Sequence, residues 1–211
     1  MSSLLPVLLE GTVVSLKVFF LTLLFSLPLG LPIAAARMSK NVFLQWPAKF
    51  FILIVRGTPL ILQLIFVYFA PFYLFGFSYD RFTAAIVAMS LNYAAYFAEI
   101  YRGGISSISQ GQYEACKVLG FTKSQTFFKI ILPQVIKRIL PATGNEVITL
   151  VKDTALVQVI GVAELFRAAQ NAASREFSTM PIFIAGVFYF VMNWIVSEVF
   201  IFSEKKLDYY K

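Results

Sequence analysis

The sequence predicts an all-α membrane protein with about five transmembrane helices. Hydrophobic residues make up 59% of its 211 positions, charged residues make up only 14%, and the mean hydropathy is +0.77. Soluble domains contain fewer apolar residues and more charged ones. Five apolar stretches are long enough to cross a bilayer, which takes roughly 20 helical residues. They cover residues 12–36, 48–75, 82–104, 141–166 and 181–203.

The chain is predicted to form one transmembrane domain over residues 1–211, because no flexible linker or change in composition divides it. In the first stretch, Pro28 and Pro32 flank Gly30, and this combination predicts a kink. Pro59 lies near the start of the second stretch, where a proline can occupy an early helical position. The stretch 141–166 is less purely apolar than the others, because it carries Glu146, Lys152 and Asp153.

The third stretch carries a polar stripe. Asn92, Tyr96 and Glu99 follow i, i+4, i+7 spacing, which places them on one face of a helix. An ionisable group at the bilayer centre costs at least about 2.5 kcal/mol on insertion scales, so such groups usually mark functional sites. We therefore expect this face to point into the protein.

The fourth stretch carries a second stripe, formed by Glu146, Thr149 and Asp153. Together the two stripes would line a cavity with negative charge, to which Thr154 and Gln158 add hydrogen-bonding groups. Carboxylates pair well with ammonium and guanidinium groups, so such a cavity would bind a substrate with a positive group.

A second interpretation of the same carboxylates is structural. Glu99 can pair with Arg102, three residues further on, and Lys152 can neutralise Glu146 or Asp153. Internal ion pairs of this kind hold helices together without touching any substrate. Residue types and spacing leave both interpretations open, although Glu146 fits a structural or gating role better than the other two carboxylates.

The basic residues are concentrated in alternate connections, and this pattern predicts the topology. They cluster in the first connection, the third connection and the tail: Arg37, Lys40, Lys49, Arg56; Arg102, Lys117, Lys123, Lys129, Lys137, Arg138; Lys205, Lys206, Lys211. The second and fourth connections hold only Arg81, Arg167 and Arg175. The positive-inside rule then places the N-terminus outside and the C-terminus in the cytoplasm. This distribution also argues against nucleic acid as the partner of a chain with net charge +7.

The third connection, residues 105–133, contains a basic segment punctuated by glycine. Gln112 to Leu119 has the pattern of a short amphipathic helix, which Gly120 should end. A second helix is predicted to run from there toward Pro133. Both helices should lie on or near the cytoplasmic membrane surface.

This segment resembles the EAA loop of permease subunits in bacterial ABC importers. The matching positions are Glu114, Ala115, Gly120, Ile130, Leu132 and Pro133, whereas Cys116 stands where the pattern has a second Ala. The resemblance implies a coupling helix that docks in a groove of an ATPase through Glu114, Ala115, Cys116 and Gly120. A plain interfacial amphipathic helix is the alternative.

Three further stretches resemble the polar amino acid subfamily of these permeases, which includes histidine, arginine and glutamine permeases. They are Arg-Gly-Thr-Pro at 56–59 with Gln63, the stretch 95–115, and the stretch 150–165. The resemblance implies the permease fold of ABC type I importers and an amino acid as substrate. It assigns the predicted cavity to that substrate, with Asn92, Tyr96, Glu99, Asp153 and Thr154 as candidate binding residues.

The resemblance also implies a set of partners. A separate ATP-binding cassette ATPase would use ATP and Mg²⁺, because this sequence has no phosphate-binding loop, nucleophile constellation or metal-ligand cluster. A second permease copy or close paralogue would complete the path, and an extracytoplasmic amino-acid-binding protein would deliver the substrate. The chain is thus expected to be a transport subunit rather than an enzyme and to bind no cofactor or metal. Its location would be the bacterial cytoplasmic (inner) membrane.

Substrate and mechanism have several candidates. Import by alternating access of a cationic amino acid (arginine, lysine or histidine) agrees best with the excess of acidic groups. Glutamine or another neutral polar amino acid is the alternative within the family. A secondary transporter or channel without an ATPase, and a membrane scaffold without substrate, are alternatives from other classes.

Overall fold

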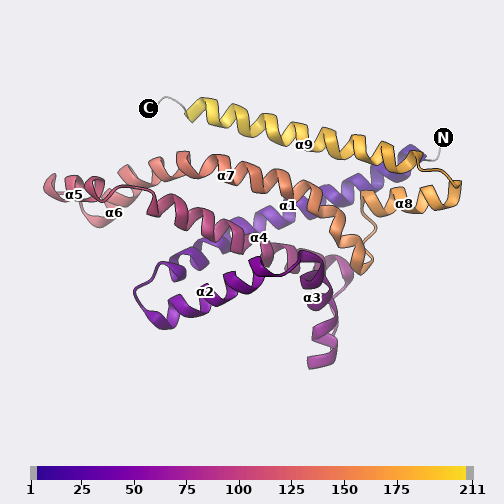
Figure 1. The fold of residues 1–211 in the computed structure, drawn as a ribbon, viewed down its shortest axis with the longest axis horizontal. Helices are drawn as coiled ribbons and strands as arrows, with labels where there is room; N and C mark the ends of the chain where they lie inside the picture. Colours follow the sequence, from indigo (N-terminus) through magenta and orange to yellow (C-terminus); the bar gives the residue numbers. More distant parts are fainter. Residues whose placement is uncertain (1–3, 208–211) are drawn as a thin grey trace.

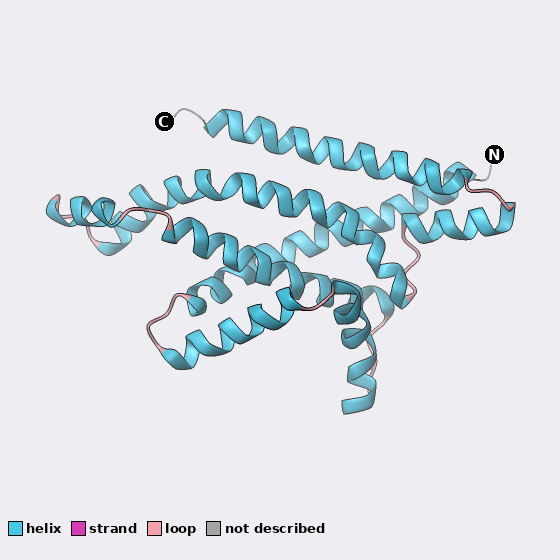
Figure 2. Ribbon diagram, in the orientation of Figure 1, coloured by secondary structure: helices cyan, strands magenta, loops and turns pink. Residues whose placement is uncertain are grey.

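The computed structural model describes residues 4–207, and the regular elements of this part are helices (Figure 2). The predicted all-α fold is confirmed. Lys211, part of the predicted basic tail, lies outside the described residues. The elements are α1 (Leu4–Arg37), α2 (Val42–Gly57), α3 (Leu60–Phe75), α4 (Arg81–Ser106), α5 (Gln110–Val118), α6 (Lys123–Gln125), the π-helix η1 (Thr126–Ile131), α7 (Leu132–Asp153), the 3-10 helix η2 (Thr154–Ile160), α8 (Leu165–Glu176) and α9 (Met180–Leu207).

The helices α1, α2, α4, α7 and α9 run along one common direction, whereas α3 turns away from it (Figure 1). The end of α9 and the short helices α5 and α6 lie at one end, whereas α8 and the starts of α1 and α9 lie at the other. This arrangement separates the basic third connection from the start of the chain, as the predicted topology requires. The direction of the chain across a membrane remains a prediction.

Length and composition support some of the five predicted spans more strongly than others. Within the described residues, α1 and α9 are each long and apolar enough to cross a bilayer, and α2 and α3 qualify only as a bent pair. α4 and α7 have 26 and 22 residues but carry the predicted polar stripes. The number of spans therefore stays a prediction.

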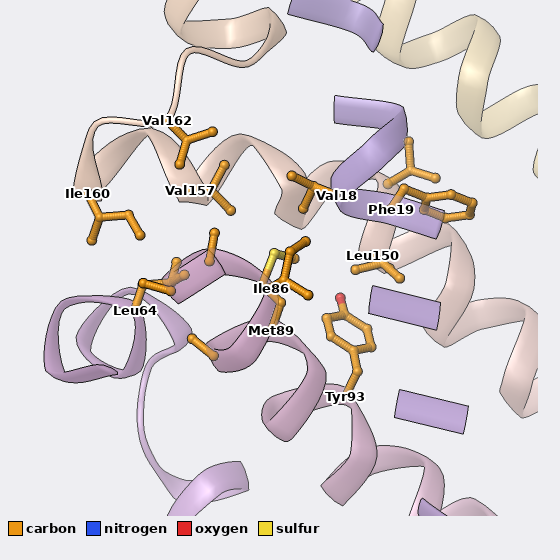
Figure 3. Packing of buried hydrophobic residues seen from close by; sticks show 14 of the residues in the cluster. Val18, Phe19, Leu64, Ile86, Met89, Tyr93, Leu150, Val157, Ile160 and Val162 are labelled. Atoms are coloured by element: carbon orange, nitrogen blue, oxygen red, sulfur yellow. The ribbon is translucent and has the colours of Figure 1, made fainter. Parts of the chain in front are cut away.

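The main core forms where α1, α4, α7 and η2 meet (Figure 3). Val18, Met89, Tyr93, Leu150 and Val157 are at most 2% exposed there. α4 packs against α1 more extensively than any other two elements pack together. Small buried residues on α4 permit this close approach, as is common between membrane helices: Ala84, Ala85, Ala88, Ala94, Ala95 and Ala98.

The second predicted helix, residues 48–75, is wrong as a continuous element. The structure has α2 and α3 instead, with a bend of 112° between them. Pro59 lacks an N–H group, and Thr58 before it is extended at φ −121° and ψ 148°. A residue that precedes proline avoids helical angles, which explains why the chain turns here.

The predicted helix boundaries around Pro133 and Pro141 are also wrong. The helix that begins at α6 continues through both prolines to Asp153, because the turn before Pro133 widens into the π-helix η1. The N–H of Leu132 donates to the carbonyl of Phe127, five residues back. This wider turn relieves the clash that a proline ring makes with the carbonyl four residues before it. The predicted helix 141–166 thus starts earlier and ends as α-helix at Asp153.

The predicted end of the first helix in the third connection is confirmed. α5 ends at Val118, and Gly120 adopts φ +76°, a left-handed conformation that favours glycine. The next helix starts with a capping box, in which Thr122 and Gln125 each bond the other's backbone. Outside the predicted spans, Asp80 caps α4, and hydrogen bonds from Thr83 hold the pKa of its carboxyl below the usual value.

We expect Gly11→Ala to destabilise the protein, because a Cβ atom there would lie 2.8 Å from the Cα of Leu165, where α1 crosses the start of α8. Overpacking of this kind typically costs about 1–3 kcal/mol. Thermal unfolding of the purified chain in detergent would measure the loss. Gly186→Ala is the matched control, since its Cβ would meet no atom within 4 Å. Equal unfolding temperatures for the two variants would contradict this packing.

Candidate functional site

The polar stripe of α4 is divided between three sets of contacts rather than facing one common cavity. Asn92 contacts α3, Tyr96 lies under an arginine of α2, and Glu99 meets two arginines. The next residue after Asn92, Tyr93, reaches α7.

Gln63 holds the bend between α2 and α3 in place. Its side-chain amide nitrogen donates to the carbonyl of Val55 at 2.8 Å and to the hydroxyl of Thr58 at 2.9 Å. Its side-chain oxygen accepts from Nδ2 of Asn92 at 2.9 Å. The amide therefore satisfies backbone released by the bend and joins it to α4. Asn92, predicted to bind substrate, is 5% exposed and engaged in this network.

Glu99 forms an ion-pair cluster at the end of α4 that lies toward α5. One of its carboxylate oxygens accepts from Nε and Nη2 of Arg102 at 2.9 and 2.7 Å. Nε of Arg37, at the end of α1, lies 3.5 Å from the other oxygen. The pairing of Glu99 with Arg102 that the sequence allowed is thus present in the structure. The participation of Arg37 was not predicted.

A pocket of about 440 Å³ opens beside this cluster, between α1, α2 and α4. Tyr96 and Glu99 line it together with three basic residues of α1 and α2. The guanidinium of Arg56 lies 5.0 Å from the ring centre of Tyr96, in a cation–π contact. The pocket thus contains two predicted site residues, but its charge is mainly positive.

Asp153 lies in a different environment. The hydroxyl of Tyr93 donates to its Oδ2 at 2.8 Å, which joins the end of α7 to α4. The side chain is half-buried, and Lys152 beside it is exposed. Within residues 4–207, no ion pair joins Lys152 to Asp153 or to the half-buried Glu146. Asp153 is therefore a carboxylate held by a neutral hydroxyl.

The remaining predicted binding residue, Thr154, faces the interior of the protein. It is 1% exposed, and its hydroxyl donates to the carbonyl of Val151 at 2.8 Å. The structure thus brings Tyr96 and Glu99 to one pocket and Asp153 to a separate contact with Tyr93. Hydrogen bonds within the protein already occupy Asn92 and Thr154.

Glu164 is a buried acidic residue that the residue spacing did not reveal as a site. It is 0% exposed and accepts from the N–H groups of Phe166 and Arg167, each at 2.7 Å. The hydroxyl of Tyr189 also donates to it at 2.7 Å, and that of Ser15 lies at 3.4 Å. Glu164 therefore caps α8 and ties α1 and α9 to its first turn. In the sequence, Glu164 stands directly before the helical pattern of α8. This N-cap position is the signal that could have revealed its role.

In the predicted docking segment, most positions lie on the surface. Glu114, Ala115 and Gly120 are exposed on and just after α5. Cys116 is 4% exposed and packs inward. The first three positions are accessible to another subunit, whereas Cys116 serves the packing of α5. Among the described residues, no group of three or more His, Cys, Asp and Glu side chains could hold a metal ion.

Comparison with known families identifies the chain. Residues 26–208 match the family model of the binding-protein-dependent transport system inner membrane component. The chain belongs to this family. The resemblance to ABC importer permeases, stated above from four sequence stretches, is confirmed.

Relatives of this permease include named amino acid transport proteins. It is 40% identical over 203 residues to the arginine transport system permease protein ArtQ of Bacillus subtilis (strain 168), covering 96% of this chain and 93% of that protein. It is 37% identical to the putative glutamine transport system permease protein GlnP of Rickettsia felis, covering 94% and 91%. It is 39% identical to the L-cystine transport system permease protein TcyB of Bacillus subtilis (strain 168), covering 97% and 88%.

Solved structures agree with this assignment. A crystal structure of an amino acid ABC transporter with histidines matches this permease with a TM-score of 0.88 and 38% identity, covering 95% of this chain and 94% of that one. An inward-facing structure of the MetNI methionine ABC transporter matches with a TM-score of 0.72 at 20% identity, covering 97% and 95%. The second match supports the fold alone. Together the matches confirm a permease fold of the ABC type I importer class.

Gln63→Leu should destabilise the permease, because it removes every hydrogen bond that the side chain makes at the bend and leaves Asn92 without its partner. An unsatisfied buried polar group costs about 1–3 kcal/mol. Thermal unfolding in detergent measures the effect, with Gln170→Leu on the exposed surface of α8 as the matched control. A similar change in both variants would mean that the amide network does not stabilise the bend.

Proposed function

We propose that this permease imports an amino acid with a cationic side chain, as the membrane path of an ATP-driven importer. Asp153 carries the proposal. It is a half-buried carboxylate at the junction of α4 and α7, and its described hydrogen-bond partner is the neutral hydroxyl of Tyr93. Lys152 is near it but forms no ion pair with it among the described residues, so a guanidinium or ammonium group would supply a direct opposite charge. The name of the arginine permease relative supports the same class of substrate.

The other predicted binding residues take part in this proposal to different degrees. Tyr96 and Glu99 line a pocket, but Glu99 is neutralised by two arginines, so it is a weaker partner for a cation than Asp153. Asn92 and Thr154 would position Asp153 and the bend rather than contact substrate, because their own hydrogen bonds lie within the protein. We therefore place the main substrate contact at Asp153.

A neutral polar amino acid is the second candidate substrate. Relatives named for glutamine and cystine transport support it. The carboxylate of Asp153, already hydrogen-bonded by Tyr93, would then accept from a side-chain amide rather than pair with a cation. Charge at position 153 separates the two candidates, since only the cationic substrate requires it.

Membership of the family supports a set of partners. A separate ATPase subunit would hydrolyse ATP with Mg²⁺ and dock at α5 through Glu114, Ala115 and the turn at Gly120. A second permease, identical or a close paralogue, would complete the path, and an extracytoplasmic binding protein would deliver the amino acid. We infer a location in the bacterial inner membrane, with the N-terminus outside and the C-terminus in the cytoplasm. ATP-driven closure of the ATPases would then alternate access to the site.

Asp153→Asn should lower arginine uptake into proteoliposomes by at least about tenfold, the change that loss of one charge-assisted contact produces. Asparagine keeps the shape and can still accept from Tyr93. Asp80→Asn, at the exposed N-cap of α4, should leave uptake unchanged. Undiminished arginine uptake would remove Asp153 from the site. A loss of glutamine uptake by the same factor would assign it a structural role instead.

Glu114→Lys should prevent copurification of the ATPase subunit, because it reverses the charge of an exposed residue on the proposed docking helix. Copurification from membranes, followed by ATP hydrolysis, measures this. Glu176→Lys makes the same charge change at the exposed end of α8, at the opposite end of the molecule from α5 (Figure 1), and should retain the ATPase. If the Glu114 variant keeps its ATPase, α5 is an interfacial helix and not a docking element.

A further inference from the structure

The pocket between α1, α2 and α4 has an excess of positive charge that amino acid transport does not account for. Arg37, Lys49 and Arg56 line it, and Glu99 is its one acidic lining residue among the described residues. That carboxylate is already paired with Arg37 and with Arg102 outside the pocket. Lys49 and Arg56 are both exposed. The pocket of about 440 Å³ is thus prepared for an anion rather than for a cationic amino acid.

The same helix presents an apolar surface beside these charges. Phe43, Trp46, Phe50 and Leu53 on α2 are between 49% and 88% exposed. The rings of Trp46 and Phe50 stack with centres 5.5 Å apart. Leu53 both lines the pocket and is 67% exposed, so the apolar surface is continuous with the rim of the pocket. Large apolar patches on a surface usually contact lipid or another protein.

We propose that this pocket binds the phosphate group of an anionic phospholipid, whose acyl chains lie along the apolar face of α2. Guanidinium groups bind phosphate oxygens through paired hydrogen bonds, and lysine adds a point charge. Helix α2 follows the first connection, whose basic residues predict a cytoplasmic position, and anionic lipids are concentrated at that surface. A free phosphate would satisfy the charges but would make no contact with the apolar face of α2.

The bound lipid would act on the geometry of the bend. Arg56 lies directly before Gly57 and Thr58, and Thr58 bonds Gln63 at the bend between α2 and α3. The guanidinium of Arg56 also lies over the ring of Tyr96 on α4. A phosphate held by Arg56 and Lys49 would therefore fix α2 against α4. This proposal does not depend on the identity of the transported amino acid, so its failure leaves the proposed transport function untouched.

Native mass spectrometry of the full-length permease, purified in detergent with its copurifying subunits, tests the proposal. The probes are phosphatidylglycerol, phosphatidylcholine and inorganic phosphate, each titrated separately. The test variant is Lys49→Gln with Arg56→Gln. The matched control is Lys40→Gln with Lys205→Gln, which removes the same charge from exposed residues that do not line the pocket.

The proposal expects phosphatidylglycerol to bind at least about tenfold more tightly than phosphatidylcholine. The pocket variant should lose this preference, and the control variant should keep it. Equal binding of both lipids, or equal loss in both variants, would overturn the proposal. Inorganic phosphate that displaces phosphatidylglycerol at the lipid's own concentration would identify a free-anion site and overturn the lipid assignment. Should the double variant fail to assemble, Lys49→Gln alone is tested for the same loss of preference.

Discussion

Breaks in helices release backbone groups that a membrane cannot satisfy, and this constraint shapes the structure around its functional regions. At the bend between α2 and α3, Gln63 bonds backbone carbonyls and also Asn92 of α4. Where η2 gives way to α8, Glu164 accepts the first N–H groups of α8 and the hydroxyl of Tyr189 on α9. Each side chain therefore bonds backbone groups that are freed at a helix break and joins that break to another helix. The same side chains therefore stabilise both the helix breaks and the packing between helices.

Two acidic residues of the bundle lie in different electrostatic environments. Glu99 lies among arginines, whereas Asp153 meets a tyrosine hydroxyl, so two carboxylates that look alike in sequence have different chemistry. The first belongs to an ion-pair cluster beside a basic pocket. The second has a neutral hydrogen-bond partner, and for this reason we propose it as the contact for a positive group of the substrate. The proposed substrate contact and the proposed anion site would therefore lie at different residues of α4, the first at Tyr93 and the second at Tyr96 and Glu99.

A continuous helical segment connects the predicted docking region to Asp153. It begins at Lys123, passes through the π-helix η1 and ends as α-helix at Asp153. The N-terminal part lies beside α5, and the C-terminal part contacts α4 through Tyr93. A displacement of α5 by a partner could therefore be carried to the α4–α7 junction by one element. The wider turn at η1 is the point along this segment where the helix departs from α-helical geometry.

The sequence by itself determined the all-α class, the family and the end of α5, because apolar length, motif spacing and the left-handed conformation of Gly120 are local properties. It also offered the pairing of Glu99 with Arg102 as one of two alternatives. Only the tertiary structure showed that this pair forms and that Arg37 joins it, and it alone revealed the partners of Asp153 and Glu164 and the bend at Pro59. Periodicity defines a face of a helix but not the helix that packs against it. Contacts between residues such as Tyr93 and Asp153, sixty positions apart, therefore depend on the assembled fold.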